Sequence, residues 1–286
     1  NRVYGILTGT VITAIIQSSS AATAMIIGFA NSSLITLKQA IWLMFGANIG
    51  TTVTAQLFAL DITSYALGIA FLGIVMMLFS KNEKTRHIAS IFAGFGILFI
   101  GLAMLGTSVV HLKFSATYQS LLEAVHNPFV GILLGLALAG IMQSSSAAVG
   151  ILQALALANA MPLMLAAYIL FGINIGTCIS TFFFASDDNA NGKRVAMSHL
   201  IFNITGTVLF TLICEVTPFI SWMGSCTANR AAQIANLHTI FNIATVLVIL
   251  PFTNLLEQMV RKIIPNSQTA AGPNRELLYI TPLNNK

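Results

Sequence analysis

The stretch IIQSSSAATA at residues 15–24 sets four consecutive polar residues inside an otherwise apolar run. The stretch IMQSSSAAVG at residues 141–150 repeats this arrangement. When residues 1–60 are laid over residues 127–186 without a gap, 23 of the 60 positions are identical. Self-similarity over this length at one fixed offset, 126 residues, indicates an internal duplication. Each QSSS segment therefore belongs to one of two homologous units.

The composition is that of a protein that crosses a membrane several times. Of the 286 residues, 56% are hydrophobic and only 7% are charged, and the mean hydropathy is +0.86. Soluble domains carry about 25% charged residues. We therefore predict an all-α polytopic membrane protein, and we attribute the net charge of +5 to cytoplasmic loops rather than to nucleic-acid binding. The chain begins at Asn1 without a signal-peptide pattern, and we expect an upstream helix to precede it.

Six stretches are apolar enough to cross the bilayer as helices of about 20 residues. The two QSSS segments, 3–32 and 129–160, admit two interpretations: one long helix with a polar middle, or a re-entrant hairpin that enters and leaves on the same side. A hairpin arm of about 14 residues rises about 21 Å, which reaches the midplane of a hydrocarbon core about 30 Å thick. The six predicted crossings lie near residues 36–60, 62–80, 88–110, 162–185, 195–217 and 234–256.

The distribution of basic residues separates these two interpretations. With hairpins, 11 of the 13 Lys and Arg residues fall on one side of the membrane, and only Lys113 and Arg230 fall on the other. With straight helices the split becomes 8 to 5. The positive-inside rule therefore favours hairpins. It also predicts as cytoplasmic the side that carries Arg2, Lys38, Lys81, Lys84, Arg86, Lys193, Arg194, Arg261, Lys262, Arg275 and Lys286.

Three crossings separate the two QSSS hairpins, and an odd number of crossings inverts the second unit relative to the first. We therefore predict two inverted-topology repeats, each with one re-entrant hairpin and three crossing helices, an arrangement found in transporters. The first repeat spans residues 1–126 and the second spans residues 127–260. Residues 261–286 are predicted to form a polar cytoplasmic tail.

The QSSS residues suit the tip of such a hairpin, where one helix ends and the next begins. The second helix starts with unpaired backbone N–H groups, which serine hydroxyls can cap and which attract anions. Irregular backbone at membrane depth is tolerated only inside protein or beside water. We therefore expect Gln17–Ser20 and Gln143–Ser146 to meet at the centre of the protein. The simpler interpretation, that QSSS only caps buried helix ends, needs just one serine in each copy.

A second motif, G-x-N-I-G-T, occupies residues 46–51 and 172–177, and its asparagine follows the glutamine of QSSS by 31 residues in both copies. Its two glycines either loosen the helix or let a neighbouring helix approach closely. Asn and Thr oxygens, together with unwound carbonyls, suit a hard monovalent cation such as Na⁺. The alternative is that the glycines only pack against the hairpin, and the two interpretations are compatible.

Charged side chains are missing where this site is predicted. No Asp, Glu, Lys or Arg lies inside either hairpin or in the middle of either G-x-N-I-G-T helix. An anion would therefore be held by neutral donors and helix dipoles, and a multiply charged anion would need co-bound cations. This favours cation symport. Acidic residues fall at helix ends or in loops, at Asp61, Asp187, Asp188, Glu83, Glu123 and Glu257.

A shorter pattern, H-x-x-F-N, occurs at residues 199–203 and 238–242. Its His and Asn share one helix face. They either line the substrate path or act as a protonation switch, or they hydrogen-bond one helix to another. The residues concerned are His199, Asn203, His238 and Asn242.

The cysteines Cys178, Cys214 and Cys226 match no metal motif, and a Cys214–Cys226 disulfide is an alternative to three free thiols.

Paired QSSS motifs, each followed 31 residues later by the asparagine of G-x-N-I-G-T, resemble the type II sodium/phosphate cotransporters. The resemblance covers residues 1–256. It implies Na⁺-coupled import of inorganic phosphate across the plasma (inner) membrane by alternating access, with Na⁺ as coupling ion and no other cofactor. It implies phosphate ligands at Gln17, Ser18, Ser19, Ser20, Gln143, Ser144, Ser145 and Ser146. It implies sodium ligands among Gln17, Ser20, Asn48, Thr51, Gln143, Ser146, Asn174 and Thr177.

The chain departs from the animal members of that family in two ways. The stretch FANSSLIT at residues 29–36 lacks the acidic residue of electrogenic members, and the long outer loop between the repeats is absent. These departures leave stoichiometry open and point to a prokaryotic member. Bacterial relatives often continue into a soluble regulatory domain, so the tail from Pro265 either leads to one or ends the chain. Formation of a homo-oligomer also stays open.

Three other functions are alternatives to phosphate symport. An uncoupled anion channel would use the same hairpins, and a sodium-coupled symporter for another oxyanion would use the same site. An intramembrane serine hydrolase would need a base near the serine. The span histidines are His199 and His238, and neither lies in a G-x-S-x-G setting, so we predict that the chain is not an enzyme.

Overall fold

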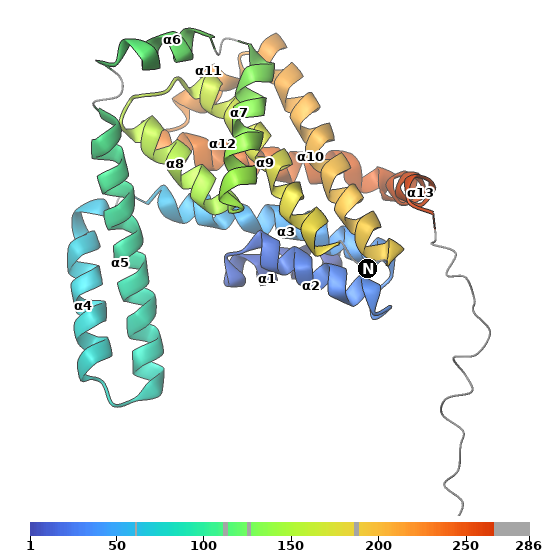
Figure 1. Cartoon of the computed structure of the whole chain (residues 1–286), viewed down its shortest axis with the longest axis horizontal. Coiled ribbons are helices and arrows are strands. Elements are labelled where there is room, and N and C mark those ends of the chain that lie inside the picture. The colour runs from blue at the N-terminus through green and yellow to red at the C-terminus, as the bar shows by residue number, and fades with distance from the viewer. Residues whose placement is uncertain (61, 111–113, 125–126, 186–188, 266–286) are drawn as a thin grey trace, which may run out of the picture.

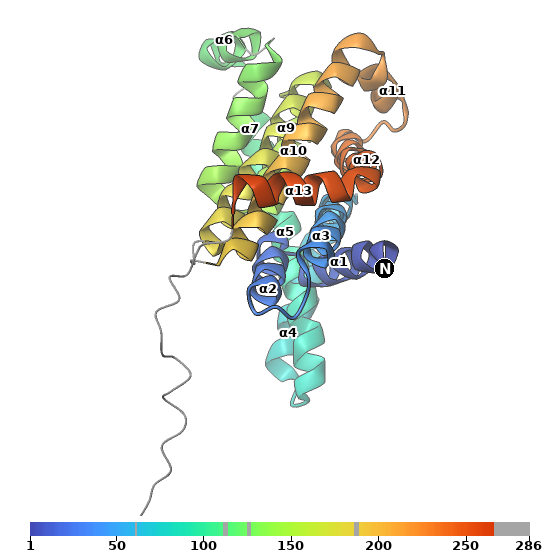
Figure 2. The same cartoon turned by 90° about the vertical axis from the view of Figure 1, so that its right-hand side faces the viewer.

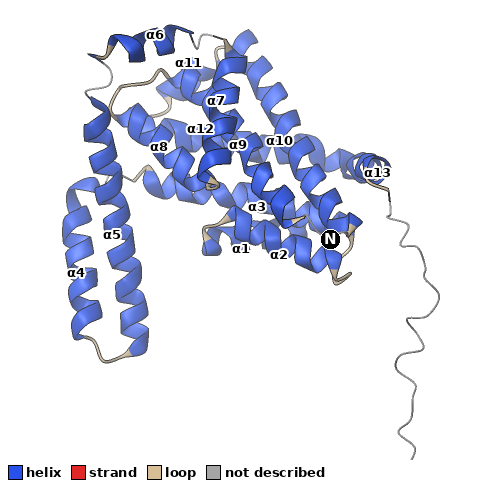
Figure 3. Cartoon of the chain, in the orientation of Figure 1, coloured by secondary structure: helices blue, strands red, loops and turns tan. Residues whose placement is uncertain are grey.

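The computed structural model describes residues 1–60, 62–110, 114–124, 127–185 and 189–265. Every regular element in these ranges is helical (Figure 3). Figure 1 shows their arrangement, with 3₁₀ turns at Thr63–Tyr65 and Leu250–Phe252. The helices are α1 (Arg2–Ile16), α2 (Ser19–Asn31), α3 (Leu37–Phe58), α4 (Ala66–Phe79), α5 (Glu83–Val110), α6 (Ala116–Ala124), α7 (Pro128–Met142), α8 (Ser145–Leu157), α9 (Leu163–Phe184), α10 (Ala190–Val216), α11 (Phe219–Ser225), α12 (Arg230–Ile249) and α13 (Thr253–Ile263).

Each QSSS segment breaks a helix at its glutamine. Gln17 adopts the left-handed conformation, with φ of 57°, and ends α1. Ser18 is extended and caps α2, because its hydroxyl accepts a hydrogen bond from the backbone N–H of Ala21. The second copy repeats this geometry at Gln143, with φ of 51°, and Ser144. The four arms have 15, 13, 15 and 13 residues, close to the predicted length.

Glycines let the first arm of each helical pair lie directly against the backbone of the following long helix. A Cβ atom added at Gly46 of α3 would lie 2.0 Å from the carbonyl oxygen of Ile6 in α1. A Cβ atom added at Gly172 of α9 would lie 1.9 Å from that of Ile132 in α7. Both α3 and α9 run unbroken through G-x-N-I-G-T. Of the two predicted roles for these glycines, the structure has close approach and not a loosened helix.

Fewer helices are long and apolar enough to span a membrane than the six predicted. Four described helical segments qualify, namely α5, α9, α10 and Arg230–Ile263. The pair of α3 with Thr63–Phe79, bent by 68°, makes a fifth if it counts as one span. The predicted crossing at residues 62–80 is shorter than expected, because α4 has 14 residues, about 21 Å, against a core of about 30 Å. The multi-pass helical membrane class is thereby confirmed, and the count of six crossings is not.

The helices form one packed bundle and one outlying pair. In Figure 1, α4 and α5 lie against each other at one side of the molecule, and α5 also packs against α8 of the bundle. Gly73 and Gly96 allow this contact, because an added Cβ would lie 2.4 Å from the backbone nitrogens of Ala93 and Ala70. The packed bundle has two apolar cores, one around Phe171 of α9 and one around Phe45 of α3.

Several predicted boundaries shift. The predicted crossing at 88–110 begins earlier, at Glu83, and the one at 234–256 is interrupted after Ile249. α13 extends to Ile263, into the segment 261–286 that was predicted as a tail. All three cysteines are free, so Cys214 and Cys226 are not bridged. Asp61, Lys113, Asp187, Asp188, Arg275 and Lys286 lie outside the described residues, as does the side chain of Glu123.

Candidate functional site

The two QSSS segments come together although 126 residues separate them in the chain. The hydroxyl oxygens of Ser19 and Ser145 lie 3.4 Å apart, within hydrogen-bond distance. Both serines are the first residues of their helices, α2 and α8. The positive ends of two helix dipoles and their first backbone N–H groups therefore converge at one place. We call residues 17–20 the first tip and residues 143–146 the second tip.

A cavity lies beside the point where the tips meet. Its volume is about 300 Å³, and it takes residues from both tips. Burial varies within the second tip: Ser145 is buried, with 8% of its surface exposed, whereas Gln143 is exposed. The cavity is lined by Ser20, Gln143, Ser180, Phe183 and Phe184. The lining therefore combines hydroxyl and amide groups with two aromatic rings and carries no formal charge.

Two hydroxyl residues beside the tips were not predicted from the sequence. Thr54 of α3 donates a hydrogen bond of 2.7 Å to Oε1 of Gln17. Ser180 of α9 lines the cavity with Gln143. Both follow their glutamine by 37 residues, so they occupy equivalent positions in the two units. The signal was present in the sequence as a hydroxyl conserved between the two copies, one turn beyond each G-x-N-I-G-T motif.

The motif asparagines point to histidines and not to the tips. Oδ1 of Asn48 lies 3.0 Å from Nε2 of His199, and Oδ1 of Asn174 lies 3.3 Å from Nε2 of His238. An amide oxygen can only accept, so the imidazole Nε2–H donates in both pairs. Each asparagine also donates from Nδ2 to the backbone carbonyl four residues earlier in its own helix. Each amide thus has a partner at both its oxygen and its nitrogen in this conformation.

Three of the four H-x-x-F-N residues contact α9, and Asn242 instead donates to the carbonyl of His238 in its own helix. Thr181 lies 3.0 Å from Nδ1 of His199, and Asn203 donates to the sulfur of Cys178 at 3.2 Å. These contacts join α10 to α9, and His238 joins α12 to α9. Three buried atoms in this group find no partner among the described residues: Nδ1 of His238 and the Oδ1 atoms of Asn203 and Asn242.

Thr51 and Thr177 stay within their own helices, where they donate to the carbonyls of Ala47 and Asn174. Each hydroxyl oxygen keeps lone pairs for a ligand. Among the described residues, no group of three or more His, Cys, Asp and Glu side chains could hold a metal ion.

Two further polar contacts were not predicted. Gln153 of α8 is buried and donates from Nε2 to the carbonyls of Ala55 and Ala231, both at 3.0 Å. It therefore joins the second arm of the second hairpin to α3 and α12. Glu215, near the end of α10, accepts a hydrogen bond from the hydroxyl of Tyr168. Gln153 is buried and Glu215 is exposed, and neither belongs to a recognisable motif, so sequence patterns did not single them out.

Comparison with known proteins finds several relatives of this chain. It is 29% identical over 259 residues to "Uncharacterized protein YqeW" of Bacillus subtilis (strain 168), covering 89% of this chain and 82% of the relative. It is 25% identical over 258 residues to "Putative inorganic phosphate export protein YjbB" of Escherichia coli (strain K12), covering 88% of this chain. The chain spans 46% of that relative's length.

A shorter match reaches a human protein. The chain is 40% identical over 60 residues to "Sodium-dependent phosphate transport protein 2B" of Homo sapiens, which covers 21% of this chain and 9% of the relative. The search of solved structures gave no significant match.

The family assignment rests on both halves of the chain. Residues 1–107 and residues 103–250 each match the Na⁺/Pi-cotransporter family. This family consists of transporters, which confirms that the chain is not an enzyme, and phosphate is the substrate that the family implies. The resemblance inferred from QSSS and G-x-N-I-G-T is confirmed: the chain belongs to the Na⁺/Pi-cotransporter family.

Proposed function

We propose that the chain is a secondary-active, Na⁺-coupled symporter of inorganic phosphate, with phosphate held between the two tips. The observation that carries the proposal is the 3.4 Å approach of Ser19 and Ser145. An anion between them would receive hydroxyl and backbone N–H donors from the starts of both α2 and α8. Two convergent helix N-termini are a favourable anion site without any basic side chain.

The neutrality of the tips supports coupling to a cation. A phosphate ion carries one to two negative charges, and no Lys or Arg lines the cavity beside the tips. Co-bound Na⁺ would balance that charge during movement through a region of low dielectric. Oxygens of Gln17, Ser20 and Thr51 in one unit, and of Gln143, Ser146 and Thr177 in the other, are the proposed sodium ligands. Thr54 and Ser180 join them because they adjoin the two glutamines.

Sodium binding by Asn48 and Asn174 carries an additional requirement. Their Oδ1 atoms accept hydrogen bonds from His199 and His238. A sodium ion bound there would share or displace those donors, so these two ligands would form only in a different state of the transporter. The hydroxyl oxygens at the tips need no such exchange, whereas Oε1 of Gln17 accepts a hydrogen bond from Thr54.

The membrane arrangement belongs to the same proposal. The two hairpins enter from opposite sides of the plasma membrane as inverted repeats, and alternating access exposes the tips to each side in turn. Most basic loops face the cytoplasm. Equivalent glycine contacts in the two units, at Gly46 and Gly172, support a shared repeat fold. An inward Na⁺ gradient would then drive phosphate import.

Labelled phosphate uptake into proteoliposomes tests coupling. We expect accumulation above equilibrium with an inward Na⁺ gradient and none with an equal K⁺ or choline gradient. Uptake that ignores the cation and stops at equilibrium would support an uncoupled anion channel instead. Sulfate or arsenate that abolishes phosphate uptake at low concentration would support a symporter for another oxyanion. Transport out of phosphate-loaded vesicles tests the direction suggested by the name of the Escherichia coli relative.

Variants of the two tip serines test the site itself. Ser19→Leu and Ser145→Leu should abolish uptake while the purified protein remains monodisperse. Ser108→Leu is the matched control, because Ser108 is exposed on α5 and its hydroxyl donates only to Met104 of the same helix. Ser19→Ala and Ser145→Ala should combine non-additively if both hydroxyls hold one anion. Full uptake by both leucine variants would remove the tips from the mechanism.

A further inference from the structure

The last described helix, α13, follows a helix, α12, that is about as long as a membrane's hydrocarbon core is thick. α12 has 20 residues and is about 30 Å long, which equals a typical hydrocarbon core. A 3₁₀ turn at Leu250–Phe252, containing Pro251, follows it. Figure 1 shows α13 nearly end-on while α12 lies across the picture, and Figure 2 shows α13 from the side. The chain thus changes direction at this turn, although Arg230–Ile263 as a whole is long and apolar enough to span a membrane.

α13 has two apolar stripes with different surroundings. Thr253, Leu256 and Val260 are buried, and α13 packs against α3 and α10. A second stripe at helical spacing faces outward, with exposures between 42% and 58%. It consists of Phe252, Leu255, Met259 and Ile263. Four large apolar side chains side by side on the outside of one short helix would be costly to leave in water.

The rest of the helix surface is polar and ends in basic residues. Arg261 and Lys262 lie exposed in the last turn, and Arg261 pairs with Glu257 at 2.9 Å. The basic residues of α13 therefore outnumber its one acid. A helix with an apolar stripe, a polar face and terminal basic residues is suited to the membrane interface, where acyl chains and headgroups meet.

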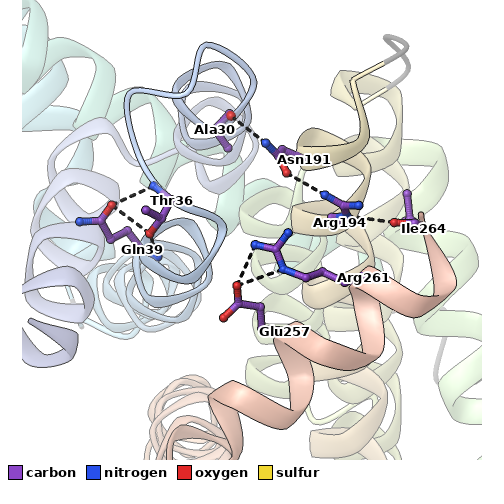
Figure 4. A network of polar contacts seen from close by, with 8 residues as sticks. All are labelled: Ala30, Thr36, Gln39, Asn191, Arg194, Glu257, Arg261 and Ile264. Carbon is purple, nitrogen blue, oxygen red and sulfur yellow. Dashed lines mark hydrogen bonds and ion pairs between the residues drawn. The ribbon is translucent and has the colours of Figure 1, made fainter. Parts of the chain in front are cut away.

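A hydrogen-bonded series connects the end of α13 to the first hairpin (Figure 4). Nε of Arg194 donates to the carbonyl of Ile264 at 2.9 Å, and its guanidinium also donates to Oδ1 of Asn191 at 3.1 Å. Asn191 in turn donates to the carbonyl of Ala30, near the end of α2, at 3.5 Å. The position of α13 is thus linked through the start of α10 to the second arm of the first hairpin.

We propose that α13 is an interfacial helix seated on the leaflet at the end of the bundle where α10 begins. Phe252, Leu255, Met259 and Ile263 enter the acyl-chain boundary, and Arg261 and Lys262 meet anionic lipid headgroups. The partner is therefore a bilayer surface that contains anionic lipid. Through Arg194, this attachment holds the end of α2 in place. The inference is independent of the transported substrate.

Nitroxide labels on the full chain in lipid vesicles test the position of α13. Leu255→Cys and Met259→Cys probe the outer stripe, and Gln258→Cys on the polar face is the matched control. All are made with Cys226→Ser, since Cys226 is the exposed native cysteine and Cys178 and Cys214 are buried. Labels at 255 and 259 should be several-fold more accessible to oxygen than to a water-soluble nickel chelate. The label at 258 should show the reverse.

Two outcomes of the labelling would overturn the proposal. Equal nickel accessibility at all three sites would place the stripe in water. Strong spin–spin broadening at 255 and 259, lost on dilution with unlabelled protein, would show that a second copy covers the stripe instead. Neither readout depends on transport, so failure of the proposed function would leave this test intact.

The lipid charge is tested separately with vesicles of phosphatidylcholine alone or mixed with phosphatidylglycerol. Each basic residue near an anionic surface is expected to favour attachment about fivefold. The oxygen-to-nickel accessibility ratio at 259 should therefore rise with phosphatidylglycerol. Arg261→Gln with Lys262→Gln should remove that rise, and 0.5 M salt should weaken it. An identical ratio in both lipids would overturn the anionic part of the proposal.

Discussion

Substituting Gly172 by alanine should force α7 away from α9 and so displace the second tip. The added Cβ would lie 1.9 Å from the carbonyl oxygen of Ile132, 2.7 Å from its carbonyl carbon and 2.9 Å from its Cα. Carbon and oxygen atoms normally approach to about 3.3 Å, so relief requires a movement of about 1.4 Å. The obstacle is helix backbone and cannot rotate aside. An added Cβ at Gly135 of α7 would likewise lie 1.9 Å from the carbonyl oxygen of Ile169 in α9. This second close contact prevents α7 from relieving the clash by sliding along α9.

The magnitude follows from two opposing terms. Overpacking of a close contact costs about 1–3 kcal/mol, and the upper end applies because both surfaces are backbone. Replacing glycine by alanine within a helix returns about 1 kcal/mol. The net loss is about 2 kcal/mol, or about 4–8 °C in Tm on the scale of soluble proteins of 150–250 residues. Phosphate uptake should fall further, because α7 carries Gln143 at its end.

Gly28→Ala is the matched control for this prediction. Gly28 lies in α2, and an added Cβ there meets no atom within 4 Å. Only the helix-propensity gain remains, so Tm should rise by about 2–4 °C on the same scale. The two variants should therefore move in opposite directions in a thermal unfolding assay of purified protein. A Gly172→Ala variant that melts at or above the wild-type temperature would refute the argument from close helix approach.

Three further predictions concern buried polar groups. His199→Ala should lower stability by about 1–3 kcal/mol in thermal unfolding, because Asn48 and Thr181 lose their partner; His199→Gln should recover part of this, and equal melting of both variants would argue against the hydrogen bond. Gln153→Leu should also destabilise by about 1–3 kcal/mol, because two buried hydrogen bonds between helices, to the carbonyls of Ala55 and Ala231, are lost; an unchanged Tm would show that these two bonds are dispensable. A maleimide should label only Cys226 in folded protein, and labelling of Cys178 or Cys214 by mass spectrometry before denaturation would contradict their burial.

Local sequence patterns predicted the bounds of the two long helices that carry G-x-N-I-G-T. The helix predicted at 36–60 runs from Leu37 to Phe58, and the one at 162–185 runs from Leu163 to Phe184. The start of α3 is set by a capping box, in which Thr36 and Gln39 exchange side-chain and backbone hydrogen bonds (Figure 4). Hairpin arms were predicted from length and charge alone. Apolar content alone predicted too many crossings, because α4 is short and α3 and α4 count as one span at most.

The family, the duplication and the chemical character of the tips could be identified from the sequence, because they depend on motifs that repeat at a fixed spacing along the chain. Which groups face each other could be seen only in the three-dimensional structure. It brought Ser19 to Ser145, turned the asparagines of G-x-N-I-G-T toward His199 and His238, and placed Thr54 beside Gln17. These contacts join residues 37 to 151 positions apart, and they depend on how closely glycine-bearing helices approach, which no local pattern encodes.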